Sequence, residues 1–137
     1  MKQKLLLYFM TLALLNISLC AKADLKKTVN VFIPGTISGV ISESEKSQIT
    51  DLTVTGTISG DDIRFIREMA GVDVKGQPVE GSLIRLDLSG VKISAGGGYY
   101  YQSSDPEQGV MSYYATSGII GSYFMCKSKL RECILPK

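Results

Sequence analysis

One spacing of apolar residues occurs three times along this chain and limits the ways in which it can fold. In each copy an apolar residue is followed after two spacers by a second, and after one more spacer by a third. The copies are Ile49-x-x-Leu52-x-Val54, Leu83-x-x-Leu86-x-Leu88 and Leu130-x-x-Cys133-x-Leu135. The last two apolar positions are two residues apart and point to the same side of a β-strand, while the first faces inward from the preceding corner. The pattern predicts three strands that share one core.

This spacing is typical of leucine-rich repeats, in which each strand stacks in parallel on the previous one. The copies start 34 and 47 residues apart, further than the roughly 20–29 residues of most such repeats. We therefore predict an α/β fold: a short leucine-rich-repeat-like solenoid cap with parallel strands, one clear helix at about 61–70 and a long Tyr- and Gly-rich loop at 94–118. The alternative is an ordinary small α/β sandwich whose strands match the pattern by chance.

The segment from Ser59 to Gly71 carries the signals of that helix. Ser59 and Asp62 have the spacing of a capping box, and acidic residues suit the positive end of a helix. The apolar stripe comprises Ile63, Phe65, Ile66, Met69 and Ala70, whereas Arg64, Arg67 and Glu68 are expected to face water. Elsewhere we expect strands at 28–33, 49–57 and within 83–93, a short helix at 36–43, a polar connection at 43–48 and a loop at 72–81.

Residues 1–23 have the composition of a secretory signal. A basic start at Met1–Lys4 precedes an apolar run, and Ala21-Lys22-Ala23 fits the small-x-small rule for cleavage between Ala23 and Asp24. The apolar run is shorter than the about 20 residues of a membrane-spanning helix. We expect an exported protein with one domain at 24–137; the alternative is a buried N-terminal helix.

The three cysteines leave two questions open. Cys20 follows Ile17-Ser18-Leu19, which weakly resembles a lipidation motif, although Leu19 is larger than usual. Contact with a membrane is expected only if Cys20 is lipidated; either route places the chain at the cell surface or outside the cell, with the periplasm as an alternative. Export permits a disulfide between Cys126 and Cys133, but we favour two buried thiols.

Composition excludes several classes of function. Three lysines lie in the leader, which leaves 12 basic and 13 acidic residues in the exported part, so nucleic-acid binding is not expected. The chain has no histidine, which removes Ser–His and Cys–His nucleophile pairs and His-ligated zinc. We predict no catalytic residue, cofactor or metal site; an enzyme that uses carboxylates alone is the remaining alternative. For Asp61 and Asp62, helix capping is favoured over cation binding with Glu68, and for Asp105 and Glu107 a polar turn is favoured.

Several segments together resemble a known family. They are Pro34–Ser38, Thr53–Ile58 with the helix that follows, Leu86–Ile93, Tyr123-Phe124-x-Cys126-x-x-x-Leu130 and Ile134-Leu135-Pro136. In these segments, which span about 29–137, the chain resembles the N-terminal region of BspA-like bacterial surface leucine-rich-repeat proteins of the Bacteroidota type. The resemblance implies an adhesin-like, non-catalytic surface or secreted protein that binds proteins or host surfaces through its parallel strands. Such proteins usually continue with many further repeats, so the resemblance implies a truncated product or a bare cap.

Outward strand positions and tyrosines make up the predicted interaction face. Its members are Thr53, Thr55, Arg85, Asp87, Ser89, Tyr99, Tyr100 and Tyr101. The tyrosines could form an aromatic platform for a partner protein or a surface glycan, but a lid over the sheet is favoured. For the five residues on the strands, the alternative is a solvated sheet face with no binding role. A small secreted carbohydrate-binding module is the second functional hypothesis.

The strand around Cys133-Ile134-Leu135 is expected to be the last of the stack. An uncovered strand edge is a template for pairing with another chain. We therefore expect self-association at Ile134 and Leu135.

Overall fold

The computed structural model describes residues 23–137. The predicted signal segment up to Lys22, including Cys20, lies outside these residues. Within the described part, no helix has both the length and the apolar content needed to cross a membrane.

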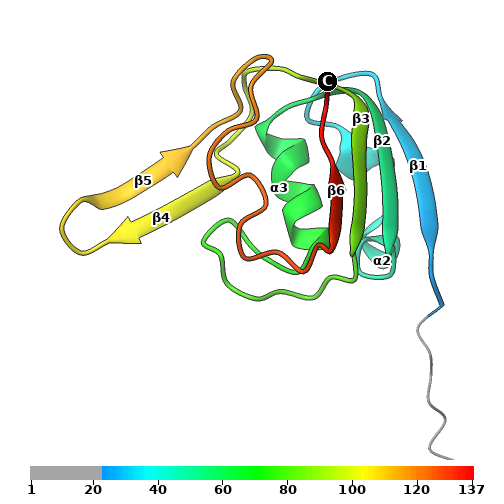
Figure 1. Ribbon diagram of the computed structural model, residues 1–137, viewed down its shortest axis with the longest axis horizontal. Coiled ribbons are helices and arrows are strands. Elements are labelled where there is room, and N and C mark those ends of the chain that lie inside the picture. Colours follow the sequence, from blue (N-terminus) through cyan, green and yellow to red (C-terminus); the bar gives the residue numbers. More distant parts are fainter. Residues whose placement is uncertain (1–22) are drawn as a thin grey trace, which may run out of the picture.

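Four parallel strands form the sheet at the centre of the fold (Figure 1). They are β1 (Lys26–Val31), β2 (Asp51–Ile58), β3 (Arg85–Ile93) and β6 (Glu132–Ile134). Their order in the sheet is their order in the chain, so each strand joins the same advancing edge. The prediction of an α/β fold with parallel strands is confirmed.

Helical segments and loops cover one face of this sheet. The main one is α3 (Gly60–Met69), and the shorter ones are the 3₁₀ turn η1 (Ile37–Gly39) and α2 (Glu43–Lys46). The predicted capping box is present, since the Asp62 carboxylate accepts the backbone N–H of Ser59 at 2.8 Å. The core between sheet and helices includes Val29, Val31, Ile37, Leu52, Val54, Ile63, Ile66, Leu86 and Leu88.

The repeated apolar spacing corresponds to aligned positions in the sheet. Leu52 lies beside Leu86, and Leu86 lies beside Cys133. The first two copies of the pattern are buried as predicted. The third keeps the register but is not buried: Cys133 is exposed and Leu135 is 45% exposed, because no further strand pairs with β6 within the described residues.

Two short helical segments differ from the prediction. The expected helix at 36–43 is only the single turn η1, and the expected polar connection at 43–48 contains α2. Ser42 starts α2 with a second capping box in which its hydroxyl accepts the N–H of Glu45. A helix start at Ser42 limits the preceding turn, because an N-cap residue has extended backbone angles.

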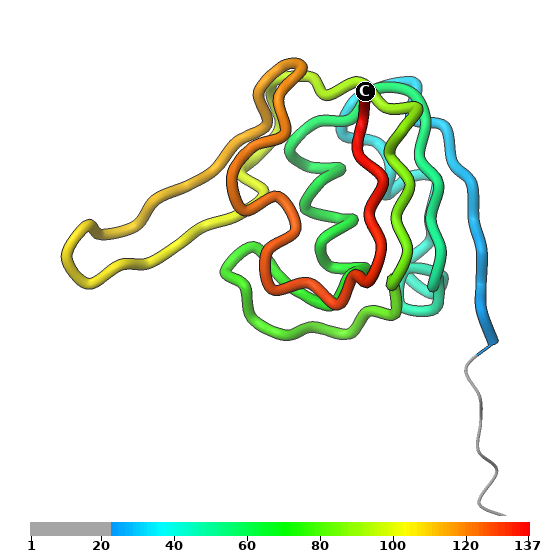
Figure 2. The backbone as a smooth tube through the Cα atoms, viewed as in Figure 1, coloured from blue at the N-terminus to red at the C-terminus, as the bar shows by residue number. Residues whose placement is uncertain are grey.

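The Tyr- and Gly-rich segment is not an irregular loop throughout. It contains an antiparallel hairpin of β4 (Tyr101–Asp105) and β5 (Gly109–Tyr113), which extends away from the sheet in Figure 2. At its tip the Asp105 carboxylate accepts the N–H groups of Glu107 and Gln108, and Gly109 has a φ of +78°. The polar-turn interpretation of Asp105 and Glu107 is confirmed.

The register of β3 predicts losses of stability of different size for two adjacent residues. Leu86→Ala should lower the free energy of unfolding by about 2–5 kcal/mol, because it empties a fully buried site. Asp87→Ala should lower it by less than about 1 kcal/mol, because this side chain lies on the open face. Urea denaturation of both variants is the test, and similar losses would contradict the register.

Candidate interaction surface

The uncovered face of the sheet carries two rows of side chains in register. These side chains alternate along each strand with the buried residues of the core. The first row contains Lys26, Asp51, Arg85 and Glu132, and the second contains Thr28, Thr53, Asp87 and Ile134. Charge alternates along the first row, while the second combines hydroxyl, carboxylate and apolar groups. The uncovered face is therefore a surface of charged, hydroxyl and apolar groups whose rows are spaced as the strands are.

An open groove runs along this face across β2, β3 and β6. Its volume is about 170 Å³, below the roughly 300–1,000 Å³ of pockets that enclose small-molecule ligands. Its side-chain lining comes from Asp51, Thr53, Arg85, Asp87, Glu132 and Ile134. A groove of this size suits a side chain of a protein partner better than a whole small molecule.

An ion pair fixes the first row between β2 and β3. Arg85 donates through Nε to Oδ1 of Asp51 and through Nη2 to Oδ2 at 2.9 Å. Asp24 lies 3.5 Å from the same Arg85 Nη2, and the Thr50 hydroxyl donates to Asp51 at 2.8 Å. The Arg85 hydrogen bond is the main cause that lowers the pKa of Asp51, and Thr50 and the charge of Lys26 act in the same direction. This part of the face is therefore pre-organised.

Asp87 is the carboxylate of the second row that remains open to a partner. It accepts the backbone N–H of Ser89 at 2.8 Å, which lowers the pKa of Asp87. No ion pair to Asp87 occurs among residues 23–137. Its charge is thus held in position by the backbone but not neutralised by a neighbour.

The predicted members of the face divide into two groups. Thr53, Thr55, Arg85 and Asp87 share the open face of the sheet. Ser89 is exposed beside them, where the pairing of β2 with β3 shifts and Thr55 lies opposite Gly90. The three tyrosines lie elsewhere.

Tyr99, Tyr100 and Tyr101, assigned to the interaction face, do not form an exposed aromatic platform, which was the less favoured of the two expectations for them. Tyr100 is 1% exposed, and its hydroxyl donates to the carbonyl of Ser122 at 2.8 Å. Tyr101 is 6% exposed and packs against the rings of Tyr113 and Tyr123. Two of the three rings belong to the core, because the hairpin brings them against the segment that leads to β6.

Tyr99 is the exception, since it is partly exposed. Its ring lies edge to face with Tyr114 at 6.2 Å between centroids, and the Arg64 guanidinium is 5.1 Å from its ring. Tyr114 is 56% exposed. These two rings form a small second surface patch that does not include the sheet.

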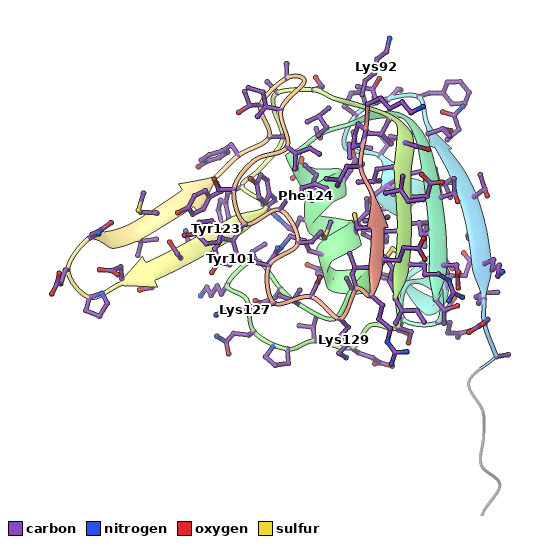
Figure 3. The ribbon with its side chains drawn as sticks, viewed as in Figure 1. Lys92, Tyr101, Tyr123, Phe124, Lys127 and Lys129 are labelled. Carbon is purple, nitrogen blue, oxygen red and sulfur yellow. The ribbon has the colours of Figure 1, made fainter. Side chains whose placement is uncertain are left out.

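Arg67 was expected to face water, and that prediction is wrong. Its side chain is fully buried. Nη1 donates to the carbonyls of Tyr123 (3.0 Å) and Phe124 (2.9 Å), and Nη2 donates to the carbonyl of Asp73 (3.2 Å). Figure 3 shows Tyr101, Tyr123 and Phe124 gathered where the hairpin meets α3. Residue 67 follows residue 63 by four positions, so helical spacing already places it on the apolar stripe.

The remaining candidate groups serve the fold. The Asp62 carboxylate accepts the N–H groups of Gly35 and Ile37 as well as Ser59, in keeping with capping. Cys126 and Cys133 are both free thiols, but the expectation that both are buried is wrong, because Cys126 is only partly buried and Cys133 is exposed. In the described part of the chain, no cluster of three or more His, Cys, Asp or Glu side chains could hold a metal ion.

Comparison with known proteins adds no relative: no family model matches the chain, and no curated protein matches it.

The Asp51–Arg85 pair predicts a specific dependence on pH. The pKa of Asp51 in the folded chain is lowered from its ordinary value of 3.8. The ion pair therefore stabilises the fold fully at pH values above that ordinary pKa. That contribution is lost as the pH falls through the lowered pKa. In a carboxyl-carbon NMR titration, Asp51 should titrate below 3.8 in the wild type and nearer to 3.8 in Arg85→Gln. Asp105 is the control: its pKa is lowered by backbone N–H groups and should not respond. The same titration midpoint for Asp51 in the wild type and in Arg85→Gln would contradict the ion pair.

Arg67→Leu should be among the most destabilising changes at a charged residue of α3. It removes the Arg67 donor from three carbonyls. Those of Tyr123 and Asp73 keep a backbone N–H donor, from Cys126 and Gly76, but among the described residues that of Phe124 does not, and a buried unsatisfied group costs about 1–3 kcal/mol. The matched control is Arg64→Leu, which removes a partly exposed guanidinium bound to the Tyr99 carbonyl alone. Thermal unfolding should show the larger loss for Arg67→Leu; equal losses would mean that Arg67 does not hold these segments.

Proposed function

We propose that this chain is an exported, non-catalytic interaction protein of adhesin-like type, at the cell surface or secreted. In this proposal its fold is the cap of a leucine-rich-repeat solenoid. Two observations support the solenoid: the strands join the sheet in chain order at one edge, and the repeated apolar spacing lies in register across it.

The observation that carries the proposed function is the open, polar face of a parallel sheet. Parallel sheets are usually covered on both faces. Here the side chains of Thr53, Arg85 and Asp87 stay accessible, although their strand neighbours are fully buried. A surface that is flat, charged in rows and rigidly supported suits contact with another protein.

The groove indicates what a protein partner would present. Asp87 would pair with a lysine or arginine, and Ile134, which is 45% exposed, would contact an apolar side chain. The threonine hydroxyls can donate and accept hydrogen bonds. The partner that fits is a polypeptide segment with a basic residue next to an apolar one.

The second candidate function is glycan binding at the Tyr99–Tyr114 patch. Exposed tyrosine rings give a large apolar contact with a polar tip, which suits sugar rings as well as proteins. The accessible ring of Tyr114 and its edge-to-face contact with Tyr99 favour this candidate.

One binding experiment separates the two surfaces. The chain from Asp24 is tested on immobilised collagen and laminin and on a glycan array, alongside Arg85→Glu/Asp87→Lys and Tyr99→Ala/Tyr114→Ala. Protein binding that falls at least about tenfold, a change of about 1.4 kcal/mol, in the sheet-face variant alone supports the proposal. Glycan binding lost in the tyrosine variant alone supports the second candidate. Tight binding to the immobilised proteins or to the glycan array that neither variant weakens would contradict the assignment of binding to both surfaces.

A further inference from the structure

Both outer strands of the sheet have an unpaired edge. Within residues 23–137, β1 pairs only with β2, and β6 pairs only with β3. All neighbouring strands run parallel, so the free edge of β6 and the free edge of β1 are the two different ends of one stack. An edge of this kind accepts a further strand through its backbone N–H and C=O groups.

The charges of the first row show which strand the β6 edge would accept. Along the row the signs are positive at Lys26, negative at Asp51, positive at Arg85 and negative at Glu132. A strand added beside β6 therefore meets the negative charge of Glu132. The strand that continues the alternation has a positive residue at this position, as β1 has at Lys26.

The following residues match in the same register. If Lys26 lies beside Glu132, then Thr28 lies beside Ile134 on the open face, and Val29 lies beside Leu135 on the core side. Leu135 is 45% exposed, whereas Val29 is 3% exposed and already belongs to the core. The added strand would continue the charged row and would cover Leu135 with an apolar residue, while Lys27 would lie beside Cys133.

We propose that copies of this chain associate head to tail, with β1 of one copy adding in parallel to the free edge of β6 of another. The occupant of the β6 edge is a second copy of this chain. Because the two contact surfaces differ, the association is heterologous and continues beyond a dimer. This inference uses the strand edges and does not depend on the function proposed for the open face.

The other pairings of these edges fit less well. Two antiparallel β1 edges would place Lys26 of one copy opposite Val31 of the other, so the charges of Lys26 and Glu132 would not be paired. Two antiparallel β6 edges would form a closed dimer through strands of three residues. Lys26 would take no part in that contact. Lysine on an edge strand usually prevents pairing, but opposite Glu132 it selects a partner.

Charge reversal tests the proposal with the chain from Asp24, which contains every described strand and helix. In sedimentation velocity at low salt, the average mass of the wild type should rise with concentration beyond that of a dimer, and added salt should reduce it. Glu132→Lys alone and Lys26→Glu alone should each remain monomeric, because each puts like charges across the contact. An equimolar mixture of the two variants should associate again. Lys92→Glu, an exposed change near the far end of β3 (Figure 3), is the matched control and should behave as the wild type.

A cross-link tests the register directly. Lys27 and Cys133 occupy the same row of the stack, so Lys27→Cys should place two thiols on adjacent strands of neighbouring copies. Adjacent strands lie about 4.8 Å apart, within the range of about 4.4–6.8 Å between the Cα atoms of a disulfide. With Cys126→Ser in the background, oxidation should give a ladder of multimers joined between residues 27 and 133, and Cys133→Ser should abolish it.

Three results would overturn the proposal. The first is a monomeric wild type at all concentrations together with no joined 27–133 peptide. The second is a closed dimer that Lys26→Glu does not change, which would indicate pairing of two β6 edges. The third is a mixture of the two charge variants that stays monomeric although each variant is folded by circular dichroism.

Discussion

The sheet is covered on one face only, and the arrangement of the rest of the molecule follows from this constraint. Burial alternates along β2 and β3, so Leu52 and Leu86 support the core while Thr53 and Asp87 stay accessible. The covering segments must all return on the same side of the sheet after each strand. Each strand then joins the same edge of the stack, and the outward side chains form rows in register. The open face is thus a product of the folding pattern, and it is also the surface that we propose for a partner.

Two buried charged residues of α3 hold the covered side together. Asp62 binds the backbone of the turn after β1 through Gly35 and Ile37. Arg67 binds the carbonyls of residues that precede β6, and also that of Asp73. Buried backbone groups of irregular segments need hydrogen-bond partners, and these two side chains supply them. One helix therefore connects turns that lie before and after it in the chain.

Much of the fold was accessible from local patterns in the sequence. The spacing of Leu52, Leu86 and Cys133 predicted the parallel strands, because period-2 alternation and the repeated corner residue are local signals. The capping box at Ser59 predicted the start of α3 for the same reason. On the candidate site, Thr53, Thr55, Arg85 and Asp87 were correctly assigned to the open face.

Features that depend on contacts distant in sequence were missed. Packing of the tyrosines was favoured, but the hairpin that brings Tyr100 and Tyr101 against residues 122–124 was not predicted, because that contact is distant in sequence. Arg67 was assigned to water by its charge, although its helical position predicted burial. Tyr100, Tyr101 and Arg67 belong to the core, so the candidate face keeps its predicted sheet residues and loses these two tyrosines.

Hydroxyl-radical footprinting of the bound chain shows whether the open sheet face is the surface that a partner covers. The chain from Asp24 is labelled free and in complex with the array component that it binds most tightly. Ile134 and Arg85 should become protected on binding, while Met111 and Tyr114, both exposed in the free chain, should stay as reactive as before. Protection of Met111 and Tyr114 with Ile134 and Arg85 unchanged would contradict binding through the open sheet face.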